Sequence, residues 1–136
     1  MTQTFSLDPS MISAIGGTFY PTGYSFVMFP DPHDAISVGD RLAAEGGFDS
    51  GDVFYLPATS VLSQITATVS DADDPLPSAG TEGATVRAYT KLAREGHAAL
   101  LVKTDDEDVA ERLMSVVRTV KYSIAQRYRM LVIEDL

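Results

Sequence analysis

The stretch that decides the fold covers residues 97–133 and is HAALLVKTDDEDVAERLMSVVRTVKYSIAQRYRMLVI. Its short apolar run, residues 98–102, is typical of a strand that is buried on both faces. The acids that follow predict the first turn of a helix, because Thr104 and Glu107 fit a capping box and acids are favourable at the positive end of the helix dipole. Residues 128–133 predict a second strand. The helix between the strands is predicted to have its apolar stripe at Val109, Leu113, Val116, Val117 and Val120.

Residues 24–56 follow the same order of strand, helix and strand. The aromatic and β-branched run 24–29 predicts the first strand. The Asp-Pro pair at 31–32 predicts a helix start, with the aspartate as N-cap, and the glycine pair at 46–47 predicts the helix end. The run 53–56 predicts the second strand. The inner face of the predicted helix consists of Ala35, Ile36, Gly39, Leu42 and Ala43.

These two halves predict a single α+β domain over residues 1–136. Two such units pair into a four-stranded antiparallel sheet with both helices on one face, which is the ferredoxin-like arrangement, the split βαβ sandwich. Residues 1–17 form an N-terminal segment. In it Asp8 and Pro9 predict a short helix that ends at the glycine pair 16–17, with a partly ordered leader as the alternative.

A helical insertion, residues 57–96, is predicted between the halves 24–56 and 97–136. Apolar residues at helical spacing predict one helix near residues 60–69 and another near residues 81–95. Acids, prolines and small residues predict an exposed acidic loop over residues 70–80. One helix followed by a long flexible linker is the alternative that the sequence leaves open.

The predicted strands carry apolar side chains on both faces, whereas the open face of a ferredoxin-like sheet is expected to be polar. An uncovered face of this kind is a large apolar patch, which monomers avoid. Either the inserted helices or a second copy of the chain must cover it. The sequence favours a homodimer, in which face-to-face sheets enclose a cavity that holds a small-molecule ligand.

Composition narrows the range of partners. A net charge of −9 argues against binding to nucleic acid and against adhesion to anionic membranes. The chain has no cysteine, which removes disulfides and thiolate metal sites. No apolar run is long enough for a membrane helix, and the first residues do not form a secretory signal, so a cytoplasmic protein is expected.

Acidic and histidine motifs are better explained by structure than by metal binding. His33 and His97 lack a third ligand at a known spacing, so no metal site is predicted. The acid runs 71–74 and 105–108 lack the spacing of a calcium loop and predict a solvated loop and a capped helix. The segment 80–83, Gly-Thr-Glu-Gly, resembles an anion-binding helix start but has no preceding strand and carries an acid, so a tight turn is favoured.

The basic and aromatic side chains give the candidate ligand-binding residues. Arg127 and Arg129 share a strand face and can bind a carboxylate or phosphate bidentately, or pair with the protein's own acids, which the sequence favours. No catalytic triad or carboxylate pair is recognisable, so no catalytic residue and no cofactor are predicted. The candidates are Tyr55, Arg87, Tyr89, His97, Arg127 and Arg129.

The order of elements resembles small uncharacterised bacterial domains of the heat-induced general stress protein type. The residues that carry the likeness are Phe26, Val27, Met28, Phe29, Asp34, Ala35, Leu42, Gly46, Gly47, Phe48, Gly80 and Gly83. The resemblance covers most of the chain after Tyr24. It implies a ferredoxin-like fold, and it supplies no catalytic residues.

Three functions remain open from the sequence. The favoured one is a self-associating binding or regulatory protein without catalysis. The second is a small-molecule enzyme of the cofactor-free oxygenase or isomerase type, with its site in a cavity enclosed by the sheet; it rests on fold analogy. The third is an acidic adaptor that docks a basic protein partner.

Overall fold

The computed structural model describes residues 3–12, 17–68, 81–130 and 132–136 and has a mixed α+β fold. Its sheet has six strands in the order β1-β3-β4-β2-β5-β6. Neighbouring strands are antiparallel except for β1, which pairs with β3 in parallel. The strands are β1 (Gln3–Thr4), β2 (Tyr24–Phe29), β3 (Val53–Leu56), β4 (Ala98–Lys103), β5 (Ile124–Arg129) and β6 (Val132–Asp135).

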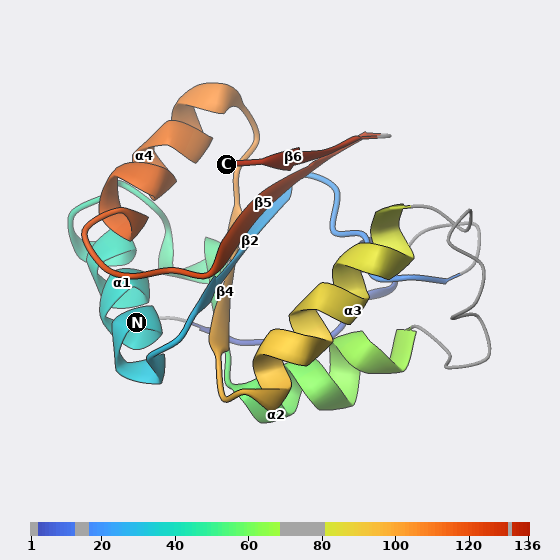
Figure 1. The fold of residues 1–136 in the computed structure, drawn as a ribbon. Coiled ribbons are helices and arrows are strands. Elements are labelled where there is room, and N and C mark those ends of the chain that lie inside the picture. The colour runs from blue at the N-terminus through green and yellow to red at the C-terminus, as the bar shows by residue number, and fades with distance from the viewer. Residues whose placement is uncertain (1–2, 13–16, 69–80, 131) are drawn as a thin grey trace.

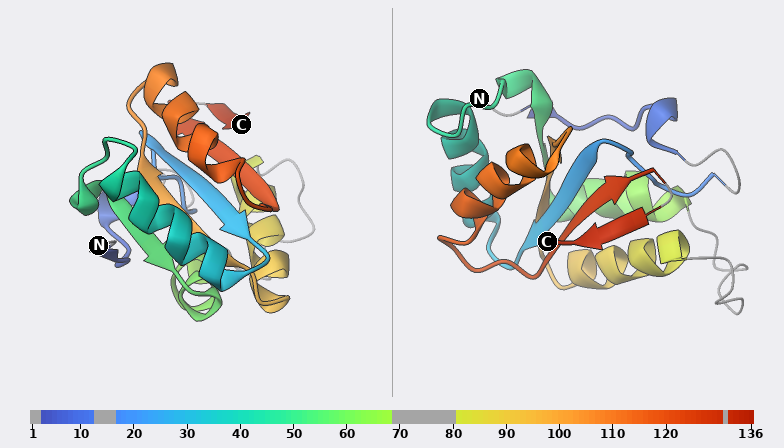
Figure 2. Two further views of the ribbon diagram at one scale, coloured as in Figure 1. Left: turned by 90° about the vertical axis from the view of Figure 1, so that its left-hand side faces the viewer. Right: turned by 90° about the horizontal axis from the view of Figure 1, so that it is seen from above.

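Helices cover both faces of the sheet, so the molecule has three layers (Figure 1). One face is covered by α1 (Pro32–Ala44) and α4 (Glu107–Val117), which lie in front of the sheet in the left view of Figure 2. The other face is covered by α3 (Thr81–Arg94) and by a helical segment over residues 58–68. That segment consists of α2 (Ala58–Ser60), a π-helical turn η3 (Val61–Ile65) and a 3₁₀ turn η4 (Thr66–Thr68), and two further 3₁₀ turns are η1 (Pro9–Met11) and η2 (Ser50–Asp52).

The two sheet faces form separate hydrophobic cores, because successive strand residues point to opposite faces. Val27, Phe29, Leu100 and Val102 pack against α1 and α4. Phe26, Met28, Ala99 and Leu101 pack on the opposite side with α3, the segment 58–68 and the N-terminal residues Phe5, Met11 and Phe19. The inserted helices and the N-terminal residues therefore pack on the second sheet face.

The sheet is larger than the four strands that the sequence predicted. The predicted last strand, residues 128–133, is in fact a hairpin in which β5 ends at Arg129 and β6 begins at Val132. Arg129 pairs directly with Val132 across the turn. The prediction was wrong because the turn contains no glycine or proline and is apolar, with Met130 78% exposed. The alternation that marks β5 begins earlier, at Ile124.

The predicted start of α1 is confirmed, whereas that of α4 is corrected. The carboxylate of Asp31 accepts a hydrogen bond from the backbone N–H of His33, as expected for an N-cap. The N-cap of α4 is Asp106, which accepts from Val109 N–H at 3.0 Å, and not Thr104. The side chain of Thr104 instead hydrogen-bonds that of Ser25, and its N–H donates to the carbonyl of Gly23.

The N-terminal segment is part of the fold in its described residues. The predicted short helix is limited to the turn η1, capped by the carboxylate of Asp8, which accepts from Ser10 N–H. That hydrogen bond lowers the pKa of Asp8. The helix does not continue because Ile12 is already extended and forms a bridge with Phe19. Residues 13–16 and the predicted acidic loop 70–80 lie outside the described residues. None of the helices in the described ranges is both long and apolar enough to cross a membrane.

Candidate functional site

A row of polar side chains crosses the α4 face of the sheet. Ser25 on β2 lies directly opposite Arg127 on β5, and Arg127 lies opposite Glu134 on β6. Thr104, which follows β4, extends the row through its 2.7 Å hydrogen bond to Ser25. We call Thr104, Ser25, Arg127 and Glu134 the polar row. The row results from strand alternation, since Ala125 and Arg127 point to this face whereas Gln126 and Tyr128 point to α3.

Arg127 is the most unusual member of the polar row, because a guanidinium is rarely buried without full pairing. Its side chain is only 8% exposed, and its Nη1 lies 3.5 Å from Oε1 of Glu134. Nε of Arg127 and Oε1 of Glu134 are both buried and have no hydrogen-bond partner. Buried polar atoms are satisfied in the great majority of cases, so the Arg127–Glu134 pair is incompletely hydrogen-bonded for its burial.

Arg127 lines two pockets. The first, of about 270 Å³, lies between α4 and the β5–β6 hairpin, and we call it the α4 pocket. In both Figure 1 and the right view of Figure 2, the C-terminal end of β6 lies beside α4 at this position. The second pocket, also about 270 Å³, lies at the end of the sheet beside Gly23, Asp105 and Arg129. The α4 pocket is lined by Glu107, Ala110, Glu111, Met114, Arg118, Arg127, Glu134 and Leu136.

The α4 pocket combines charges of both signs with an apolar floor. Arg118 and Glu111 form an exposed ion pair at its rim, with an N–O distance of 3.1 Å. Buried Ala110 and Met114 supply apolar surface beside Arg127. Such a site can hold a small molecule that carries both polar and apolar groups.

Tyr89, another predicted site residue, belongs to a separate network on the α3 face. Its hydroxyl donates to Oε1 of Gln126 at 2.7 Å and lies 2.9 Å from the hydroxyl of Tyr128. Nε2 of Gln126 in turn donates to Asp135. Burial, together with the neighbouring Tyr128, raises the pKa of Tyr89 well above its ordinary value. This network fixes α3 to β5. Tyr89 lines neither of the two pockets, whereas Tyr128 also lines the pocket beside Gly23.

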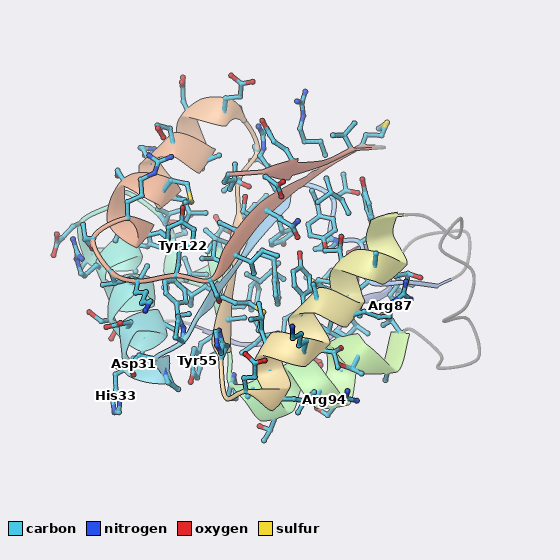
Figure 3. The ribbon with its side chains drawn as sticks, viewed as in Figure 1. Asp31, His33, Tyr55, Arg87, Arg94 and Tyr122 are labelled. Carbon is cyan, nitrogen blue, oxygen red and sulfur yellow. The ribbon has the colours of Figure 1, made fainter. Side chains whose placement is uncertain are left out.

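His97 and Tyr55 lie at the opposite end of the sheet from Arg129. Nδ1 of His97 lies 2.9 Å from Oγ of Ser123, which also donates to the carbonyl of Met28. The pair therefore ties the starts of β4 and β5 to the end of β2. Burial raises the pKa of Tyr55, which lies at the lower end of the sheet in Figure 3. Neither residue lines the α4 pocket or its neighbour.

The predicted site residues thus do not form one site. Arg127 and Arg129 share a face, as expected, and both line the pocket beside Gly23. Arg127 also pairs with an acid of its own chain, Glu134. Arg87 lies on α3, on the other side of the sheet (Figure 3).

The histidines and acids give no metal site in the part of the chain that the structure describes, where no group of three or more such side chains could hold an ion. The side chain of His33 is 95% exposed at the start of α1, beside Asp31. The acid run 71–74 and Gly80 lie outside the described residues.

Sequence reasoning missed Ser25, Thr104, Glu134 and Arg118. A signal was present for the first of these, because a serine interrupts the otherwise apolar strand 24–29. Glu134 was missed because β6 was not recognised as a strand of its own.

Comparisons with models of protein families, with curated proteins and with solved structures found no match for this chain. The resemblance to general-stress-protein-type domains therefore stays a prediction.

Proposed function

We propose that this chain is a small ligand-binding domain without catalytic activity, built on a ferredoxin-like core, and that the α4 pocket is its binding site. Two observations support the ferredoxin-like assignment. The four central strands have the order β3-β4-β2-β5, and α1 and α4 pack on the same face of them. The strands β1 and β6 extend this core at its two edges.

The observation that carries the binding function is the incompletely hydrogen-bonded ion pair of Arg127 and Glu134, two residues that line the α4 pocket. Keeping Arg127 buried next to a poorly hydrogen-bonded Glu134 costs stability, since desolvation of two charges is only partly offset by a 3.5 Å ion pair. A ligand that bonds to both side chains offsets this cost. A few polar groups set beside apolar side chains in a concave site are typical of small-molecule binding sites.

Two earlier hypotheses lose their main support. Self-association and the enzyme alternative both require an uncovered sheet face that closes a cavity against a second sheet. Both faces are packed by the chain's own helices and N-terminal residues. The adaptor alternative rests on the net charge of −9 alone.

A thermal-shift screen with a library of small metabolites tests the binding function. We expect compounds that raise the Tm of the wild-type protein and fail to raise that of Glu134→Gln. Asp135→Asn is the matched control, because it removes the same charge from the same strand but on the opposite face, where Asp135 contacts Gln126. Compounds that stabilise both variants and the wild type equally would place binding elsewhere and contradict the proposal.

A further inference from the structure

Two side chains that line the α4 pocket, Arg127 and Glu134, each keep one buried atom without a hydrogen-bond partner. Nε of Arg127 is a donor that needs an acceptor, and Oε1 of Glu134 is an acceptor that needs a donor. Because Nη1 of Arg127 is 3.5 Å from that same oxygen, the two orphans belong to one ion pair. A ligand that displaces part of this ion pair supplies an acceptor to Arg127 and a donor to Glu134 on neighbouring atoms.

Charge around the pocket selects a ligand with no net charge. Its lining includes the cations Arg118 and Arg127 and the acids Glu107, Glu111 and Glu134. A ligand with only a carboxylate is repelled by these acids and by the net charge of −9 of the whole protein. A ligand with only an amine is repelled by the guanidinium of Arg127. A zwitterion avoids both penalties, because its carboxylate faces Arg127 and its ammonium faces Glu134.

Size and the apolar floor restrict the rest of the ligand. A volume of about 270 Å³ is slightly below that of sites for drug-sized molecules, which hold roughly 300–1,000 Å³. The apolar surface comes from Ala110, Met114 and Leu136, beside the charged groups. This surface suits a small aliphatic side chain.

From these observations we infer that the α4 pocket binds a free α-amino acid with an aliphatic side chain. The inference rests on the proposed binding function and specifies its ligand class. Arg127 receives the carboxylate, Glu134 receives the ammonium group, and the aliphatic side chain lies against Met114 and Leu136.

Isothermal titration calorimetry with three matched probes tests the ligand class. The probes are L-leucine, isocaproate, which lacks the ammonium group, and isoamylamine, which lacks the carboxylate. We expect L-leucine to bind the wild-type protein at least tenfold more tightly than either analogue. Glu134→Gln should weaken L-leucine binding at least tenfold, and Arg127→Met should abolish it. Asp135→Asn should bind like the wild type.

The outcomes separate the ligand class from the binding function. Isocaproate or isoamylamine binding as tightly as L-leucine would overturn the amino-acid class. If none of the three probes binds but a library compound loses its affinity in Glu134→Gln, the class is wrong while the binding function stands. If no compound binds, and a high-resolution structure shows only water bridging Arg127 and Glu134, both are wrong. Circular dichroism of Arg127→Met checks its folding, and Glu134→Gln carries the test if that variant unfolds.

Discussion

Buried polar side chains on the two sheet faces are organised in different ways. On the α3 face, Tyr89, Tyr128 and Gln126 satisfy one another through short hydrogen bonds. On the α4 face, Ser25 and Thr104 satisfy each other, whereas Arg127 and Glu134 keep one unsatisfied atom each. The first arrangement is what a structural network requires. The second arrangement leaves hydrogen-bonding groups that we propose a ligand satisfies.

The Ser25–Thr104 hydrogen bond allows a double-mutant test at the residue scale. Ser25→Ala and Thr104→Val should each cost about 1–3 kcal/mol of unfolding free energy, because each leaves one buried hydroxyl without its partner. The double variant should cost clearly less than the sum, since it removes both hydroxyls. Urea unfolding measures the three values. Additive costs would contradict the pairing.

Tyr89 gives a pH-dependent prediction. Its pKa is raised in the folded protein, so above the unfolded value of about 10 the unfolded state releases a proton that the native state retains. The stability that the neutral phenol contributes is therefore complete below about pH 10 and is lost as pH rises further. The advantage of the wild type over Tyr89→Phe in unfolding free energy should narrow above about pH 10. Guanidinium unfolding of both proteins at neutral and alkaline pH measures it. A constant difference would contradict the assignment.

At the scale of elements, the start of α4 was predicted two residues too early. The sequence suggested Thr104 as N-cap because Glu107 follows at capping-box spacing. Tertiary structure overrides this local pattern, since Thr104 still bonds to the chain before β2 and is needed beside Ser25. Asp106 takes the capping position instead.

The N-cap of α4 can be tested with neighbouring aspartates. Asp106→Ala should lower the unfolding free energy by about 1 kcal/mol, because the N–H of Val109 loses its acceptor. Asp105→Ala should have a smaller effect, limited to the loss of a charge near the helix start. Thermal unfolding of the two variants compares them. Equal effects would show that charge, rather than the cap hydrogen bond, matters here.

A helix or strand could be predicted from the sequence where the residues that determine it lie close together in the chain. Strands β2 and β4 and helices α1 and α4 were predictable, because apolar periodicity and an Asp-Pro start are local signals. The β5–β6 hairpin was not, since its turn lacks the usual turn residues and its tip is held by a distant contact. There the hydroxyl of Tyr20 donates to the carbonyl of Arg129 at 2.6 Å.

The candidate site was predictable only in part, for a related reason. Arg127 could be proposed because it stands beside Tyr128 and shares a strand face with Arg129. Its pairing with Glu134 depends on the register of a hairpin that the sequence did not reveal.

At the scale of the whole molecule, the inserted helices determine whether a sheet face stays open for a second copy of the chain. They and the N-terminal residues complete the second core, so the reason for face-to-face pairing of two copies is absent. We expect light scattering after size exclusion to give the monomer mass of 14.6 kDa at micromolar concentration. Twice that mass would restore the homodimer that the apolar strands suggested.

The central claim is that a small molecule binds between α4 and the β5–β6 hairpin. Methyl-labelled methionines test it most directly, because Met114 lines the α4 pocket, Met130 lines its neighbour and Met28 lies in the opposite core. During titration with L-leucine, or with a compound that stabilises the protein in the thermal-shift screen, we predict a saturable shift of the Met114 methyl resonance. The Met28 resonance should stay in place. Binding that moves Met28 or Met130 and leaves Met114 unchanged would contradict the account.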